Sequence, residues 1–386
     1  MKVLMVVNTR FELYYLSSVG YLLKQAHPET DLQLMIESSL VKSAPSELLQ
    51  LYSQILAMDF PILSVEPTLE TFKSLRFLQE FRRSLRFRCE LNRLDFDVDI
   101  VCISSFRGHF ANIFCRRMKG RARLVAFRMA DQEVERLFRV RRPLRSLYAN
   151  LFNRAFGIST MEFRWHDEMA HGFSYWLTKD PYDRTICITD WGHGRRGNQF
   201  RLPPPFVALR HYYDLESEKD TRPTIVVVGE RTPLYKGWSS KDRSLYAHVF
   251  EFVREKFSKH RLLFRPRERL TNLESVKPFI TGFEVMPADI PFEELCIRNS
   301  YSKVISIKST ACKVAAYCGD PAYVLFPLFD FPPAYRRIIE AYLSDAQDIV
   351  RVRDLRELLH DPQTRRRLDI DEMKHLYWQA LMETTQ

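Results

Sequence analysis

Short apolar runs alternate with longer segments of helical period, and this alternation occurs twice along the chain. Runs this short and rich in β-branched residues indicate buried strands, and strands that alternate with helices indicate a parallel, doubly wound sheet. In the first half we expect strands at residues 3–7, 32–36, 99–104 and 123–127, and helices at 13–23, 46–58, 75–94 and 110–118.

The second alternation begins after a region rich in turn residues, which predicts loops over about residues 160–221. We expect strands at 224–228, 261–264, 303–306 and 322–326, helices at 239–259, 292–299 and 309–318, and further helices to the C-terminus. The predicted domains are 1–160, on the acceptor side, a connecting region 161–221, and 222–386, which binds the nucleotide. This is typical of the GT-B architecture, in which two Rossmann-like domains face an interdomain cleft.

Length and composition agree with two folded domains. The chain has 386 residues, more than one core usually holds, and 46% of them are hydrophobic against 27% charged. Its 7 cysteines show no CxxC spacing, so neither a disulfide framework nor a zinc site is expected. No stretch approaches the roughly 18 apolar residues of a membrane span. We therefore expect a cytoplasmic protein that binds no metal.

Basic residues exceed acidic ones, with 58 Lys and Arg against 48 Asp and Glu and a net charge of +10. The excess gathers at residues 82–88, 116–123 and 136–145. Basic surface attracts anionic lipid, acidic glycan or nucleic acid, and solvated helix faces would show the same pattern. No nucleic-acid-binding signature accompanies it, so we expect peripheral contact with the inner face of a membrane rather than nucleic acid.

Two loops at predicted strand ends carry candidate ligand groups. FRPRE follows the strand 261–264, and the guanidinium of Arg265 or Arg267 can pair with a phosphate through two hydrogen bonds. SIKSTA leads from a strand into a helix, where Ser309 or Thr310 can cap the helix and Lys308 adds charge beside its amides. A surface loop with an Arg267–Glu268 ion pair, and a helix cap without a ligand, are the alternative readings.

Together these motifs give residues 224–329 a resemblance to the nucleotide-binding domain of bacterial lipooligosaccharide sialyltransferases and capsule polysialyltransferases. Those enzymes carry a K-P-H-P-R-E-like motif after one strand and a Ser/Thr-rich motif at a later helix. The resemblance implies that Arg265, Ser309 and Thr310 hold the donor phosphate. The family histidine is replaced here by Arg265, which cannot donate a proton near neutral pH.

A third loop follows the strand 123–127 and contains Asp131 and Glu133. In similar families an acidic residue before a glycine in this loop acts as general base, and Asp131 matches it, although Gln132 replaces the glycine. A sugar hydroxyl that attacks an anomeric carbon must lose its proton, so a carboxylate suits this place. Glu133 is the second candidate, and a solvated first helical turn is the alternative reading.

The resemblance implies inverting, metal-independent transfer of an acidic sugar, sialic acid or a relative, from a CMP-sugar donor to a glycan or glycolipid acceptor. No cofactor is expected besides that donor substrate. One alternative is a GT-B glycosyltransferase with a UDP-, GDP- or CDP-linked donor. The other, of a different class, is a non-catalytic basic protein of the same fold that binds polysaccharide or nucleic acid.

Overall fold

The computed structural model describes residues 1–60, 75–103, 109–128, 163–164, 174–175, 182–188, 194–196, 199–214, 222–230, 238–267, 273–343, 348–362 and 369–383. The chain divides into two compact units. Met1–Pro203 forms the first unit together with Asp371–Gln386, and Pro204–Ile370 forms the second.

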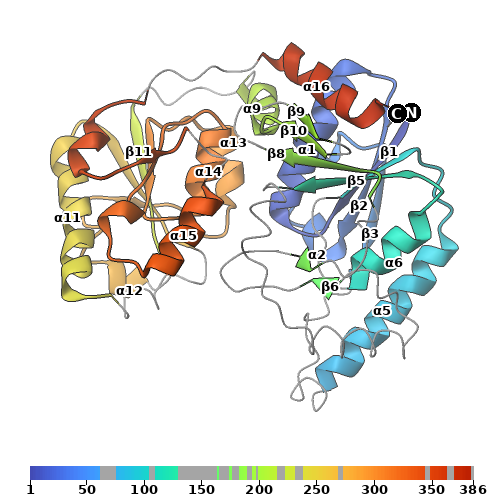
Figure 1. Cartoon of the computed structure of the whole chain (residues 1–386), viewed down its shortest axis with the longest axis horizontal. Helices are drawn as coiled ribbons and strands as arrows, with labels where there is room; N and C mark the ends of the chain where they lie inside the picture. Colours follow the sequence, from blue (N-terminus) through green and yellow to red (C-terminus); the bar gives the residue numbers. More distant parts are fainter. Residues whose placement is uncertain are drawn as a thin grey trace. The chain divides into compact units, whose positions relative to one another are not determined.

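The first unit is built on an eight-stranded sheet with the order β3-β2-β1-β4-β5-β8-β10-β9 (Figure 1). Neighbouring strands are parallel except β9, which runs antiparallel to β10. The strands are β1 (Lys2–Val7), β2 (Asp31–Glu37), β3 (Gln54–Met58), β4 (Ile100–Ile103), β5 (Arg123–Arg128), β8 (Arg184–Ile188), β9 (Gly194–Arg196) and β10 (Gln199–Leu202). A separate antiparallel pair joins β6 (Phe163–Arg164) to β7 (Ser174–Tyr175).

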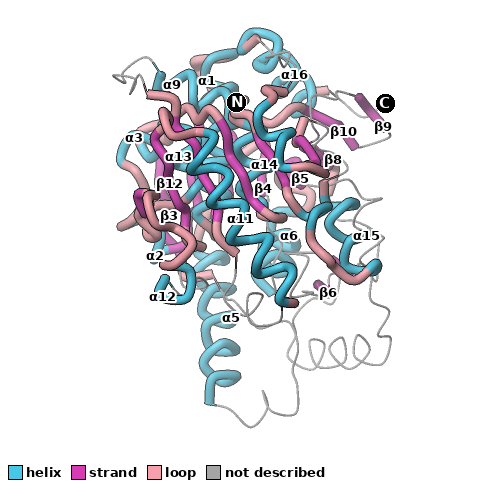
Figure 2. Tube along the Cα trace, turned by 90° about the vertical axis from the view of Figure 1, so that its left-hand side faces the viewer, coloured by secondary structure: helices cyan, strands magenta, loops and turns pink. Residues whose placement is uncertain are grey.

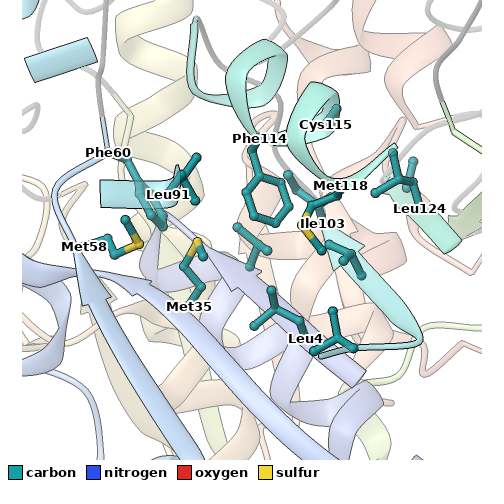
Figure 3. Packing of buried hydrophobic residues seen from close by; sticks show 14 of the residues in the cluster. Leu4, Met35, Met58, Phe60, Leu91, Ile103, Phe114, Cys115, Met118 and Leu124 are labelled. Atoms are coloured by element: carbon teal, nitrogen blue, oxygen red, sulfur yellow. The ribbon is translucent and has the colours of Figure 1, made fainter. Parts of the chain in front are cut away.

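The helices of this unit cover the sheet with apolar faces. They are α1 (Arg10–Ala26), α2 (Ser38–Val41), α3 (Ser46–Leu49), α5 (Leu75–Arg93), α6 (His109–Met118) and α16 (Ile370–Met382). Phe114 and Met118 of α6 point toward Leu4 and Ile103 on the strands (Figure 3), and all four side chains are at most 1% exposed. Burial of each large apolar side chain contributes about 1.5–3 kcal/mol, so this contact fixes α6 to the sheet.

Helix α16 returns from the second unit to the first. Arg184 donates from Nη1 to the carbonyl oxygen of Ala380 at 2.5 Å, and Arg123 donates to that of Leu381 at 2.7 Å. These carbonyls belong to the last turn of the helix, whose carbonyl oxygens have no amide partner within the helix. The Tyr377 hydroxyl also donates to the carbonyl of Pro203 at 2.7 Å. The C-terminal helix is thus held by side chains of the first unit.

The second unit contains a six-stranded, wholly parallel sheet with the order β13-β12-β11-β14-β15-β16. Its strands are β11 (Thr224–Val228), β12 (Arg261–Arg265), β13 (Glu284–Val285), β14 (Lys303–Ser306), β15 (Ala322–Val324) and β16 (Val350–Arg351). Its helices are α9 (Phe206–Asp214), α11 (Ser240–Lys256), α12 (Leu273–Val276), α13 (Phe292–Arg298), α14 (Thr310–Tyr317) and α15 (Pro333–Tyr342), with 3-10 turns η2 (Phe326–Leu328) and η3 (Leu355–Leu359).

The sheet of the second unit lies between α11 on one side and α13 and α14 on the other (Figure 1). Figure 2 shows α11 lying along the strands. Helices cover both faces of this doubly wound sheet, so a ligand can reach the sheet at the ends of its strands. On the α13 side, Arg210 of α9 donates to Asp320 Oδ1 at 2.9 Å and to the Asn299 carbonyl at 3.0 Å. This buried pair fixes α9 to the unit.

The division into units differs from the predicted domains in two respects. Residues 161–221, expected to be a connecting region, contribute β8, β9 and β10 to the first sheet, and the boundary falls at Pro203. The terminal helix, expected in the second domain, packs on the first. β8 and β10 are short strands of five and four residues, so their pattern in the sequence is weak.

One predicted helix is also wrong. Residues 46–58 form the short helix α3 and then strand β3, which pairs in parallel with β2 from Gln33–Gln54 to Glu37–Met58. Leu, Ala and Met favour a helix on their own, but the open edge of β2 offers backbone partners to this segment. Within the described residues, no helix is long and apolar enough to cross a membrane, and all seven cysteines are free thiols.

Candidate functional site

The candidate site lies at the carboxyl edge of the sheet in the second unit. Val228, the last residue of β11, pairs in register with Arg265 on one side and with Ser306 on the other. Adjacent strands are about 4.8 Å apart, so the ends of β12 and β14 lie about 10 Å from each other. The loops after these strands therefore meet at one edge, as the sequence motifs predict.

Glu230 connects these loops. It is the second residue after β11, and its side chain is 0% exposed. Its Oε1 accepts a hydrogen bond from the backbone amide of Lys308 at 3.3 Å, and its Oε2 lies 3.7 Å from Nη1 of Arg267. A buried carboxylate is costly unless it is paired, and here the Arg267 guanidinium and the Lys308 backbone amide are its partners. Glu230 thereby sets the backbone of one loop and the guanidinium of the other.

The N-terminus of α14 lies at the same edge. Ser309 is the N-cap, and its hydroxyl oxygen accepts a hydrogen bond from the amide of Ala311 at 3.3 Å. The Ser309 amide donates to the Ser306 hydroxyl at 3.0 Å. Thr310 is the first helical residue, and the first turn contains no acidic residue. The structure agrees with the predicted cap, and the positive end of the helix dipole is not offset by a carboxylate of its own turn.

Lys308 brings a positive charge to this helix end. Its ammonium lies over the rings of Tyr335 and Phe331, 4.4 Å and 6.0 Å from their centroids. The two rings contact each other edge to face at 5.3 Å. Aromatic faces attract a cation, so this contact orients the Lys308 ammonium. Lys308 and Arg267 are both partly exposed.

Arg265 is placed differently from the expectation for a phosphate ligand. It is 4% exposed, and its guanidinium donates to backbone carbonyls of the segment after β13. Nη1 donates to Pro287, and Nη2 donates to Ile290 at 2.5 Å and to Ala288 at 3.5 Å. The last side chain of β12 thus holds a neighbouring loop, and Arg267, two residues later, carries a charge nearer to solvent.

The thiol beneath the helix start is not a nucleophile. Cys312 Sγ lies 3.1 Å from Ser306 Oγ, and burial raises the pKa of the thiol to about 12. A thiol with so high a pKa stays protonated at neutral pH, and the thiolate is the reactive form. Cys312 therefore packs and orients Ser306 rather than reacting.

The predicted general bases, Asp131 and Glu133, lie outside the described residues. Sequence reasoning also missed Glu230. Its signal was a carboxylate two residues after a buried strand, in TIVVVGE, at the edge where ligands of doubly wound sheets bind. Among the residues that the structure describes, no three His, Cys, Asp or Glu side chains gather in a way that could hold a metal ion.

The fold of the whole chain is similar to known structures. No family model and no curated protein sequence matches the chain. A putative UDP-N-acetylglucosamine 2-epimerase from Listeria monocytogenes has a TM-score of 0.53 and 13% identity, covering 100% of this chain and 91% of that one. The UDP-GlcNAc 2-epimerase from Methanocaldococcus jannaschii has a TM-score of 0.51 and 10% identity, covering 100% and 94%. The chain has the GT-B type of fold, with two Rossmann-like α/β domains.

Proposed function

We propose that the chain is a glycosyltransferase that moves an acidic sugar, sialic acid or a related keto-sugar acid, from a CMP-linked donor to a glycan or glycolipid acceptor. The observation that supports this is that Glu230 joins the Arg267 guanidinium to the Lys308 backbone amide, directly before the first turn of α14, while the Lys308 ammonium lies over Tyr335. The carboxyl edge of a doubly wound sheet is where nucleotides bind, and Arg267, Lys308 and the first turn of α14 all favour an anion there.

The chemistry requires charge stabilisation on the leaving group. As the bond between the anomeric carbon and the phosphate oxygen breaks, the electron pair goes to the phosphate of CMP. Arg267 can pair with two phosphate oxygens, Lys308 offers a point charge, and the amides of the first turn of α14 donate hydrogen bonds. Because CMP carries a single phosphate, these groups suffice without a metal ion. Arg265 then acts as a positioning residue that holds the segment after β13.

The acceptor hydroxyl attacks the anomeric carbon and passes its proton to a carboxylate. We assign this role to Asp131, with Glu133 as the second candidate, on the basis of their place after β5. Positioned general bases typically contribute about 10²–10⁴-fold to the rate. No leaving-group protonation is assigned to position 265, because an arginine there stays charged at neutral pH.

A UDP-linked substrate is the second candidate. Both structures named above are epimerases of a UDP-sugar, and the edge around Glu230 suits a diphosphate as well as a monophosphate. A UDP-, GDP- or CDP-sugar glycosyltransferase would use the same groups. A non-catalytic protein that binds polysaccharide would not need Arg267, Lys308 or the first turn of α14 to contact a phosphate.

The test compares nucleotides and one variant. Lys308→Met removes the ammonium and keeps an apolar stem beside Tyr335. Charged hydrogen bonds contribute about 1.5–3 kcal/mol, so we expect CMP affinity, measured by calorimetry, to fall about 10–100-fold. Lys241→Met, which removes an exposed cation from α11 of the same unit, should bind CMP like the wild type.

Turnover separates the candidates. With CMP-sialic acid and a glycan acceptor, the wild type should release CMP and form the sialylated product. Binding and turnover of UDP-sugars alone would replace the CMP proposal with the second candidate. If the wild type binds no nucleotide although it and both variants are folded, the non-catalytic alternative would replace the proposal.

A further inference from the structure

Helix α5 carries a solvent-facing row of arginines that the proposed reaction does not use. Arg82, Arg86, Cys89 and Arg93 follow each other at spacings of four, three and four residues, so they lie along one face of the helix. All four are exposed, and the Arg86 side chain is 76% exposed. We call this row, together with the adjoining Leu85, the α5 basic face.

The opposite face of α5 anchors the helix to the first unit. Phe87 and Leu91 are one turn apart and 1% exposed each, and they belong to the core of the first sheet. Phe87 also meets Phe60 edge to face, with ring centroids 6.0 Å apart. The basic face is therefore held outward by the packing of the helix. In Figures 1 and 2 one end of α5 extends away from the other described elements.

The charge of this surface is strongly one-sided. Residues 82–93 contain five arginines and one glutamate, Glu90, which pairs with Arg86 at 2.9 Å. Arg83 and Arg88 are exposed on either side of the basic face. Near a negatively charged bilayer, each basic residue contributes about 1 kcal/mol, and the attraction falls off within the Debye length of about 8 Å at physiological salt. Several arginines on one face therefore act together.

An apolar residue beside the arginine row distinguishes a bilayer from a soluble polyanion as the partner of this face. Leu85 is 41% exposed and lies one turn from both Arg82 and Cys89. A polyanion in water gains nothing from a leucine, whereas a bilayer can bury it at the boundary between headgroups and acyl chains. The methylene stems of arginine can lie at the same depth while their guanidinium groups reach the phosphates.

We propose that the α5 basic face binds the surface of an anionic phospholipid bilayer. The helix would lie in the plane of the interface, with Leu85 inserted between headgroups and with Arg82, Arg86 and Arg93 on lipid phosphates. The first unit would then be bound to the membrane as a peripheral protein. This proposal does not depend on which sugar donor the chain uses.

The experiment is sedimentation with vesicles made of equal parts phosphatidylcholine and phosphatidylglycerol, compared with phosphatidylcholine alone. The wild type should bind the anionic vesicles at low salt and bind them less as the salt concentration rises. It should not bind the vesicles of phosphatidylcholine alone. Arg82→Gln/Arg86→Gln should weaken binding about 30-fold, as expected for the loss of two such charges. Leu85→Gln should weaken it several-fold even at high salt.

The matched control is Lys241→Gln/Lys277→Gln, which removes the same charge from exposed positions of the second unit. It should bind vesicles like the wild type, and thermal melts should show that all variants are folded. Absence of binding to anionic vesicles, or equal loss in the two double variants, would overturn the proposal. Binding to heparin that depends on Arg82 and Arg86 but not on Leu85, without vesicle binding, would assign the face to a soluble polyanion instead.

Discussion

Gly229, between β11 and Glu230, has no room for a side chain. A Cβ atom added there would lie 2.7 Å from Cζ of Phe264 and 3.4 Å from the carbonyl oxygen of Arg265. The Phe264 ring is 0% exposed and packs against Phe250, with centroids 6.0 Å apart. The Gly229 amide donates to the Arg265 carbonyl at 2.9 Å, which fixes the backbone. Gly229→Ala therefore forces the ring or the strand end to move.

The expected loss of stability in Gly229→Ala follows from how closely the new methyl group would approach Phe264. Carbon atoms pack best at about 3.5–4.0 Å, so the ring or the strand end must yield by about 1 Å. Overpacking of this kind costs about 1–3 kcal/mol, which for a unit of this size lowers Tm by about 2–4 °C per kcal/mol. Urea unfolding followed by tryptophan fluorescence would measure the loss.

A double-mutant cycle tests the cause. Phe264→Leu removes the ring atoms that the new methyl group would meet, so Gly229→Ala should cost at least about 1 kcal/mol less in that background. A Gly229→Ala variant as stable as the wild type, or costs that simply add in the double variant, would refute the explanation by contact with Phe264.

Three further predictions concern charged groups. Arg210→Met leaves the buried Asp320 without the guanidinium 2.9 Å away, and should cost about 3–5 kcal/mol in urea unfolding. Burial raises the pKa of Glu37 above its usual 4.5, so the folded protein binds this proton more tightly than the unfolded chain. The free energy of unfolding of the wild type, relative to that of Glu37→Gln, should therefore fall as pH rises from 4.5. A difference that is independent of pH in urea titrations would contradict this. Asp131→Asn should lower kcat about 10²–10⁴-fold while CMP still binds; near-normal turnover would shift the role to Glu133.

The four inner strands of the second sheet could be predicted from the sequence to within two residues, whereas its two-residue edge strands β13 and β16 could not. Thr224–Val228 and Lys303–Ser306 have the predicted bounds, because both are short, β-branched runs buried on both faces of a parallel sheet. Residues 54–58 could not be assigned in this way. Gln, Leu, Ala and Met suit either structure, and pairing with β2, distant in sequence, decides between them.

The candidate site was predictable in place but not in detail. The described parts of the two motifs, residues 264–267 and 306–311, lie at one sheet edge, because β12 and β14 both pair with β11. The roles within them depend on contacts that no local pattern contains. Glu230 is recognised only when its neighbours Lys308 and Arg267 are placed in space.

The orientation of Arg265 follows from the loop that it binds. The segment Pro-Ala-Asp-Ile-Pro at residues 287–291 begins and ends with proline, and each proline lacks an amide hydrogen, so the segment has more backbone acceptors than donors. A guanidinium has five N–H donors in one plane and can satisfy several carbonyls at once, which a histidine cannot do. Three carbonyls of this segment accept from Arg265. Arg265 thus serves the loop that leads into α13, and in the proposed function the charge on the donor phosphate is met by Arg267 and Lys308 instead.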